Sequence, residues 1–517
     1  MPIVIGLDLG TTHAKAIALD QNGGVIASAA RGYPMHTPQP GRAEQNPQVV
    51  WRGAAEALHE LAGKLQRDDI AGLCLSGAMH SSLPVSADGT PLAPALTWAD
   101  QRASALARRL RSQTDTHALY LRTGCPLQPI YHVAKLRWWV EQEPDIARRA
   151  AFFVTIKDYI LFCLTGQWIG DISVYSATGL LDIRRYTWDD EALALAGVTA
   201  SQLPPLASPF TLVGQLSENG TRVTVLPAHI PVFLGASDGG LANLGAGASH
   251  PGQSVITIGT SGAVRRIVAK PYLDIQSEFP ENSAERCSLS PKRCSLSPRT
   301  WCYLLAEDRW FSGGAINNGG LAVQWVREKF YPELSAEAGY QRLFKDAAET
   351  SPGSEGVTLL PYFAGERSPY WNAEARAVIT GLGLAHDRRH VARAVLEGVA
   401  FRLAEIWEAL GAPDSNEAVR LTGGILQSPA WAQIVCDVLG SPLAAVETGD
   451  ASAVGAAMLG FAALGLAPSL DALAGRVQPG VSWQPNQENH ALYRAGLDRF
   501  RKLYIALYSE GVFPKIR

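Results

Sequence analysis

A strand–turn–strand pattern that occurs twice is the feature that most constrains how this chain can fold. The first copy, at residues 3–20, runs from IVIGLDLG through a Gly-Thr-Thr turn into AKAIALD. The second, at residues 254–268, runs from SVITIG through a Gly-Thr-Ser-Gly turn into AVRRIV. Near-continuous apolar runs joined by glycine turns are typical of buried, paired strands. Two such openings, so far apart in the chain, predict two domains built on one plan.

Chain length agrees with this prediction. The 517 residues, 47% of them hydrophobic, exceed what one ordinary core accommodates. We place the domains at residues 1–247 and 248–517, because the segment LGAGASHPG at 244–252 is small and rich in turn-forming residues.

Charge and composition exclude several kinds of partner. A formal net charge of -3 with 18% charged residues leaves no nucleic-acid-binding footprint. The start, MPIVIGLDLG, has no basic region followed by a signal-peptide core, and the seven scattered cysteines form no CxxC pair, so we expect a cytoplasmic protein with reduced thiols. The uncharged stretch between Asp450 and Asp471 is rich in Ala and Gly, which favours a buried helix over a membrane span.

The first turn carries residues suited to phosphate binding. Gly10, Thr11 and Thr12 offer close backbone approach and two hydroxyls, and Lys15 lies just beyond them. Asp8, at the end of the preceding strand, could hold Mg²⁺ through water. The alternative is an ordinary hairpin whose Asp and Thr serve turn geometry alone.

The second copy of the turn favours the phosphate interpretation. Gly259 and Thr260 repeat the same chemistry, and two such hairpins facing each other could hold a polyphosphate from both sides. Neither GxxxxGK[ST] nor GxGxxG occurs in the chain, so P-loop and Rossmann phosphate sites are unsupported.

An aspartate at the end of an apolar strand is the candidate general base. In FLGASDGG, Asp238 enters a glycine-rich turn where a carboxylate could accept the proton of an attacking hydroxyl. The alternative is that Asp238 caps the helix that follows.

Two further segments offer groups that bind polyols. His80 follows a buried-type strand, at the kind of strand end where ligands bind in α/β sheets, although a lone histidine is more often structural. The segment TWADQR contributes an aromatic face in Trp98, a carboxylate in Asp100 and a guanidinium in Arg102. Sugars use such groups, and so does any polar surface.

A helix and a glycine turn follow in the second half. Apolar residues spaced three and four apart over 391–410 predict a helix, with Asp387 as its cap. It leads to VRLTGGI, in which Gly423 and Gly424 form a turn open enough for adenine or ribose. The alternative is a strand-to-helix turn without a ligand.

A tandem duplication interrupts the second half. RCSLSP occurs at 286–291 and again at 293–298, which indicates a tolerated insertion in a surface loop rather than a regulatory element.

Taken together, these motifs resemble the FGGY family of carbohydrate kinases over nearly the whole chain. Each motif alone is weak, and their joint order is highly specific. In chain order they are Asp8–Thr12, AMHS at 78–81, TWADQR at 97–102, GASDGG at 235–240, GTSG at 259–262, PYFAGERSPYW at 361–371 and TGGILQSPAWAQIVCDVLG at 422–440.

The resemblance implies an α/β fold of two ribonuclease-H-like domains, related to actin and hexokinase, with ATP and sugar in the cleft between them. It implies Asp238 as catalytic base, and Met79 and His80 on the sugar side, where we also place Trp98 and Asp100. The positions that it places around ATP are Gly10, Thr11, Thr12, Gly259, Thr260, Gly320, Gln324, Gly423, Gly424 and Gln427.

Within the family, AMHS, TWADQR and the stretch at 300–320 look most like gluconate kinases, which predicts phosphorylation of D-gluconate to 6-phosphogluconate. Xylulose kinases usually carry glycine where this chain has Ser81, so a xylulose or other sugar kinase is the alternative. An actin-like ATP sensor is the alternative of another class. An acidic sugar needs a cation, for which Arg102, Lys157 and His80 are candidates, and a homodimer is possible because dimers are common in the family.

Overall fold

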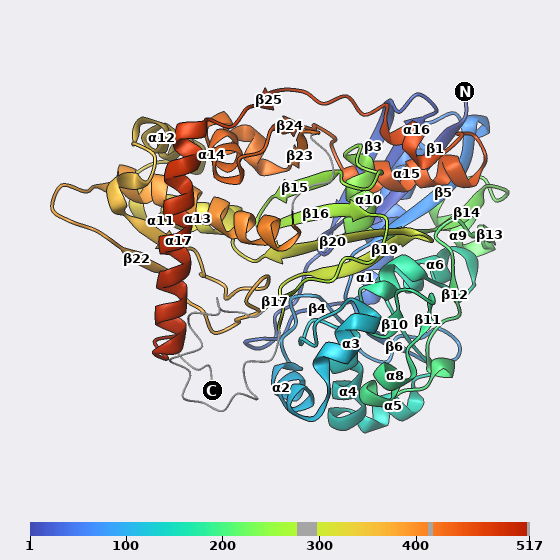
Figure 1. Ribbon diagram of the computed structural model, residues 1–517. Coiled ribbons are helices and arrows are strands. Elements are labelled where there is room, and N and C mark those ends of the chain that lie inside the picture. Colours follow the sequence, from blue (N-terminus) through green and yellow to red (C-terminus); the bar gives the residue numbers. More distant parts are fainter. Residues whose placement is uncertain (277–296, 412–416, 514–517) are drawn as a thin grey trace.

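A computed structural model describes residues 1–276, 297–411 and 417–513 of the chain (Figure 1). The RCSLSP duplication lies outside the described residues, apart from Ser297–Pro298, which form the short strand β18. No helix in the described ranges is long and apolar enough to cross a membrane.

The first half of the chain builds a six-stranded sheet in the order β13-β14-β5-β1-β2-β3. An antiparallel meander of three strands is followed by two strands parallel to β1. Apolar side chains fill the sheet, since β1 is buried at every position. The strands are β1 (Ile3–Leu9), β2 (His13–Asp20), β3 (Val25–Gly32), β5 (Ile70–Gly77), β13 (Leu212–Gln215) and β14 (Pro231–Ser237).

The second half repeats this plan in a seven-stranded sheet, ordered β19-β20-β16-β15-β23-β24-β25. Strands β15, β16 and β20 form the antiparallel meander, and β23 and β24 run parallel to β15. The prediction that both strand–turn–strand copies open similar sheets is therefore confirmed. The strands are β15 (Ser254–Ile258), β16 (Gly262–Val268), β19 (Trp301–Ala306), β20 (Arg309–Ile316), β23 (Val419–Thr422), β24 (Leu443–Ala445) and β25 (Ser482–Trp483).

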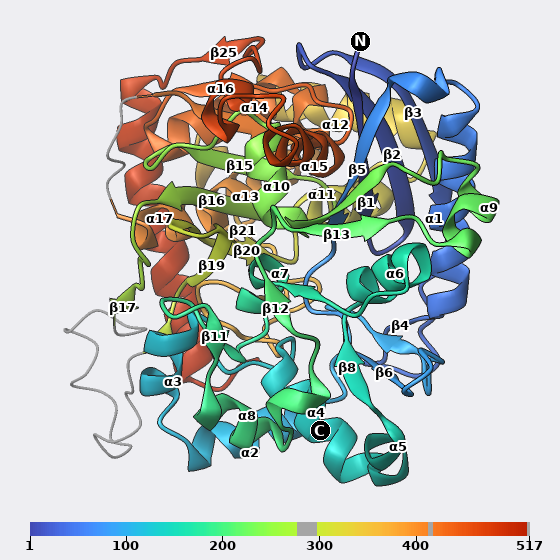
Figure 2. The ribbon, with the colours of Figure 1, turned by 90° about the vertical axis from the view of Figure 1, so that its right-hand side faces the viewer.

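Helices cover the faces of both sheets (Figure 1). The predicted helix at 391–410 is confirmed as α13 (Arg388–Ala409), and the Asp387 side chain caps it. A helical lobe with its own core extends below the first sheet in both views (Figure 2). The lobe comprises α2 (Ser104–Gln113), α3 (Thr116–Thr123), α4 (His132–Gln142), α5 (Pro144–Arg149) and α8 (Asp190–Ala196). The other long helices are α1 (Pro47–Ala62), α6 (Ile156–Thr165), α11 (Gly320–Phe330), α12 (Ala336–Glu349), α14 (Pro429–Leu439) and α17 (Gln487–Ser509).

Two helices join the halves by packing on each other without intervening side chains. They are α10 (Asp238–Gly245), which follows β14, and α15 (Ala451–Ala463), the segment predicted to be a buried helix of small residues. A Cβ on Gly245 would lie 1.9 Å from the carbonyl oxygen of Ala451, and one on Gly455 would lie 2.0 Å from that of Leu241. Helix α15 also lies against β1, where a Cβ on Gly6 would be 1.9 Å from the Ala453 oxygen. The backbones therefore touch only because these positions are glycine.

This contact predicts that Gly455→Ala destabilises the protein. The added methyl group meets backbone rather than a movable side chain, so we expect a cost of about 1–3 kcal/mol, as for overpacked cores. The measurement is the denaturant midpoint, with Gly63→Ala at the end of α1 as control, because a Cβ there meets nothing closer than 3.5 Å. Equal midpoints for the two variants would contradict the close-packing argument.

Candidate active site

The candidate base lies where β14 passes into α10. The side chain of Ser237 caps α10 by accepting a hydrogen bond from the N–H of Gly240. Asp238 is therefore not the cap of this helix, which was the alternative role considered from the sequence. Asp238 instead accepts the N–H of Gly239 at 2.7 Å. Burial raises the pKa of Asp238, while Arg265 and the backbone N–H groups of Gly239 and Met79 act in the opposite direction. A half-buried carboxylate with raised basicity suits proton abstraction.

Three carboxylates gather at this point of the cleft. Asp8, at the end of β1, accepts a 2.6 Å hydrogen bond from Ser76 in β5, and Lys15 in β2 pairs with Asp450 at 2.7 Å. Burial, then the charge of Asp450, raise the pKa of Asp8 to about 8, and Asp238 adds to this effect. Lys15 offsets the negative charge on Asp8, and Arg265 offsets that on Asp238. Carboxylate oxygens are the donors that magnesium prefers, and because no three ligating side chains converge within the described residues, a magnesium ion here would keep water ligands.

The first phosphate turn is tied to the protein through its carbonyl oxygens. Tyr33 donates its hydroxyl to the Gly10 oxygen and its N–H to the Thr12 oxygen, and Gln45 donates to the Thr11 oxygen at 2.7 Å. The carbonyl oxygens of this turn are thus bonded to the protein and do not face an incoming anion. Thr12 is exposed and Gly10 and Thr11 are partly exposed.

The second turn docks on the start of α11. The N–H of Gly320 donates to the Gly259 oxygen at 2.7 Å, and that of Leu321 donates to the Thr260 oxygen at 3.0 Å. A Cβ on Gly320 would lie 2.7 Å from the Gly259 oxygen, so this helix start can approach the turn only as glycine.

The Gly-Gly turn after β23 lies next to the second phosphate turn. Gly423 has φ +94°, and a Cβ there would be 2.5 Å from the Ile258 oxygen, directly before the second phosphate turn. The predicted nucleotide positions of the second half therefore share one edge of the second sheet. Gly259, Thr260, Gln324, Gly423, Gly424 and Gln427 are all exposed there.

On the sugar side, His80 adopts the left-handed conformation, with φ 71°. Its Nδ1 lies 2.8 Å from the Ala177 carbonyl oxygen, which fixes the proton on Nδ1 and leaves Nε2 as an acceptor. Burial, then Lys135, lower the pKa of His80 well below its ordinary value, so the ring is neutral. Tyr131 packs edge-on against it at 5.3 Å.

A buried lysine holds the two sugar-side segments together. Lys135 donates to the carbonyl oxygens of His80 at 2.6 Å and Thr97 at 2.7 Å. The adjacent Trp98 donates its indole N–H to the Thr11 hydroxyl at 3.0 Å, so the sugar-side aromatic ring is bonded to the first phosphate turn. The structure thereby brings Met79, His80 and Trp98 to the same cleft as Asp238.

Three sequence-based candidates are bonded to other groups of the protein. The Asp100 carboxylate is saturated by the N–H of Ala43 and by the N–H and guanidinium of Arg102, which also pairs with Glu44. Lys157 pairs with Asp171 at 2.6 Å, and both side chains are inaccessible. In this structure Asp100, Arg102 and Lys157 are thus bonded to other groups of the protein, and their predicted roles toward the sugar stay predictions.

The sequence analysis missed three charged residues in the cleft. Asp450 caps α15 and pairs with Lys15 of the first half. Arg265 lies in β16 beside Gly239, and Arg367, in the GERSP segment, lies over the Trp98 ring at 5.2 Å. Two adjacent arginines in an otherwise apolar strand after the GTSG turn were the signal available for Arg265.

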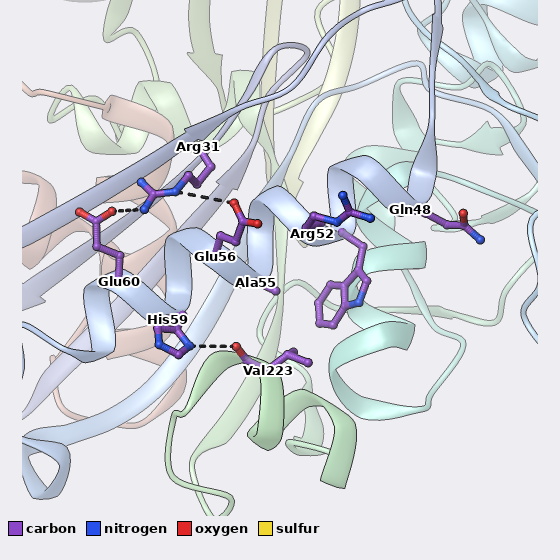
Figure 3. Close-up of a pocket in the computed structure, with 9 residues that line it drawn as sticks. Arg31, Gln48, Arg52, Ala55, Glu56, His59, Glu60 and Val223 are labelled. Carbon is purple, nitrogen blue, oxygen red and sulfur yellow. Dashed lines mark hydrogen bonds and ion pairs between the residues drawn. The ribbon is translucent and has the colours of Figure 1, made fainter.

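A separate groove on α1 lies apart from this chemistry (Figure 3). Trp51 and Arg52 line it, and Arg31 pairs there with Glu56 and Glu60. None of the residues of the candidate site lines this groove, so we place the active site where the two phosphate turns and Asp238 lie, between the two sheets.

Comparison with known proteins places the chain in a family. Residues 3–245 match the N-terminal domain, and residues 255–464 the C-terminal domain, of the FGGY family of carbohydrate kinases. The gluconokinase of Bacillus subtilis (strain 168) is 32% identical over 508 residues, which cover 97% of this chain and 95% of that protein.

Solved structures agree. The gluconate kinase from Lactobacillus acidophilus superposes with a TM-score of 0.89 at 29% identity, over 98% of each chain. The ligand-bound xylulose kinase from the same organism gives a TM-score of 0.90 at 29% identity, over 99% of this chain and 100% of that one. The predicted α/β fold of two actin- and hexokinase-like domains is thus confirmed. The chain belongs to the FGGY family of carbohydrate kinases and is an ATP-dependent kinase of a small-molecule sugar.

Proposed function

We propose that this sugar kinase phosphorylates D-gluconate at its C6 hydroxyl, giving 6-phosphogluconate. The observation that carries the proposal is the 32% identity to a gluconokinase over 97% of the chain. Xylulose is the second candidate, because the gluconate and xylulose kinase structures are equally similar in sequence, at 29%. Ser81 does not decide between them, since its hydroxyl accepts the N–H of Ile156 at 2.9 Å inside the first domain.

In the proposed mechanism, Asp238 accepts the proton of the terminal hydroxyl as that oxygen attacks the γ-phosphate of ATP. Phosphoryl transfer asks the protein mainly for positioning and charge stabilisation, which the turns at 10–12 and 259–260 supply from opposite sheets. Asp8 would hold Mg²⁺ through water, with Asp450 close by, and the bound ion would offset negative charge on the phosphates. His80 Nε2 would accept a hydrogen bond from a hydroxyl group of the sugar.

Closure of the domains over both ligands is part of this proposal. It would exclude water from the γ-phosphate and so limit wasteful hydrolysis of ATP. The joined helices α10 and α15 are the contact about which the halves would move.

The substrate assignment predicts the outcome of an ADP-release assay with Mg-ATP. We expect D-gluconate to drive turnover, and xylulose, ribulose, glycerol and erythritol to give little above the sugar-free rate. Faster turnover with xylulose would overturn the gluconate assignment and leave the kinase intact. Equal ADP release with no sugar would contradict a sugar-dependent mechanism.

The base assignment predicts that Asp238→Asn lowers kcat by about 10²–10⁴-fold while sugar affinity is largely kept. The amide preserves shape but cannot accept the proton. Because burial raises the pKa of Asp238, the acid limb of the wild-type rate profile should lie above the ordinary carboxyl range and be lost in the variant. Asp471→Asn, which disrupts a pair with Arg309 outside the cleft, is the control. Normal turnover in Asp238→Asn rules out this role.

A further inference from the structure

Two arginines near the candidate base form no salt bridge with a carboxylate of the described residues. A Cβ on Gly239 would lie 3.3 Å from Arg265 Nε, so Arg265 contacts the residue next to the base. Arg367 lies over Trp98. Within the described part of the chain, the Nε atoms of both arginines are buried without a hydrogen-bond partner. Their remaining bonds are long, 3.4 Å from Arg265 to the Thr257 hydroxyl and 3.3 Å from Arg367 to a carbonyl oxygen.

The nearest acids offset the charge of this pair only in part. Asp238 acts electrostatically on Arg265, and Glu366 acts on Arg367. The Glu366 carboxylate, however, accepts from the Arg402 guanidinium and from the backbone N–H groups of Asn317 and Arg367, and among the described residues it forms no ion pair with the Arg367 side chain. Burial lowers the pKa of both guanidinium groups, and Arg367 lowers the pKa of Arg265 further. Burying partly unsatisfied cations is costly unless an anion joins them.

We propose that Arg265 and Arg367 together form the subsite for the carboxylate of an aldonic acid, so that the cleft selects an acidic sugar over a neutral ketose or polyol. This inference rests on the proposed function and deepens it. Guanidinium groups present planar, paired N–H donors that match a carboxylate, and Arg367 is already oriented by Trp98.

The position of the pair favours a sugar carboxylate over an ATP phosphate. Arg367 acts electrostatically on His80, Tyr131 and Tyr303, and the hydroxyls of these two tyrosines lie 2.7 Å apart. This is the aromatic, sugar-side wall of the cleft. The two phosphate turns have their own backbone and hydroxyl groups.

Calorimetric titration of D-gluconate and of D-glucitol, in which a neutral hydroxymethyl group replaces the carboxylate, tests this subsite. Wild type should prefer gluconate. Arg265→Met and Arg367→Met should each weaken gluconate binding by about 10- to 100-fold, as expected for charge-assisted bonds, with glucitol binding changed less than about threefold. Lysine at either position should restore only part of the affinity, because it keeps charge without the paired donors. Arg309→Met, on the neighbouring strand β20, is the matched control.

The other possible results of these titrations overturn either the arginine subsite or the proposed substrate. Unchanged gluconate affinity in either folded methionine variant overturns the shared subsite, and so does an equal loss of affinity for a non-hydrolysable ATP analogue. If the methionine variants do not fold, the lysine variants and the wild type still test the subsite. Full gluconate affinity in both lysine variants overturns it, and so does a wild type that shows no preference for gluconate over glucitol. Wild type that binds xylulose and neither gluconate nor glucitol contradicts the proposed substrate itself, which is a distinguishable failure.

Discussion

The close contact between α10 and α15 is the constraint on which the active site depends. Both helices begin at a cleft carboxylate, Asp238 for α10 and the capping Asp450 for α15. The hydroxyl of Ser452 donates to the Asp238 carbonyl oxygen at 3.1 Å, so the two helix starts are directly bonded. Glycines at the crossing let the backbones touch, and this sets the distance between a base from one half and an acid from the other. A wider crossing would separate the carboxylates.

Acidic and basic side chains lie at different places in the proposed active site. Carboxylates cluster where a metal ion and phosphates would meet. Burial, and then the charge of Asp450, raise the pKa of Asp8 to about 8, and a bound cation would favour its ionised form. Partly unsatisfied arginines lie on the sugar side, where Arg265 also favours the ionised form of Asp238. The opposite imbalances at the two ends would orient an acidic sugar with its hydroxyl at the base and its carboxylate away from the phosphates.

Local patterns predicted the paired strands, their glycine turns and helix α13, because apolar runs and helical spacing are read within a few residues. The two-domain fold followed from the order of the motifs along the chain, and the role of Asp238 as base stays a prediction. Asp238 was found as an acid at a strand end. The charged partners across the cleft were not predictable, since nothing local shows that Asp450 meets Lys15 of the other domain. The same limit applies to Asp100, because nothing local shows that its carboxylate also accepts the distant N–H of Ala43.

A crystal structure of the protein with D-gluconate and a non-hydrolysable ATP analogue tests the central claim, the role of Asp238, most directly. The account predicts the C6 hydroxyl within about 3.2 Å of the Asp238 carboxylate and facing the γ-phosphate. A reactive hydroxyl bonded to a different side chain, with Asp238 turned away from it, would contradict the account.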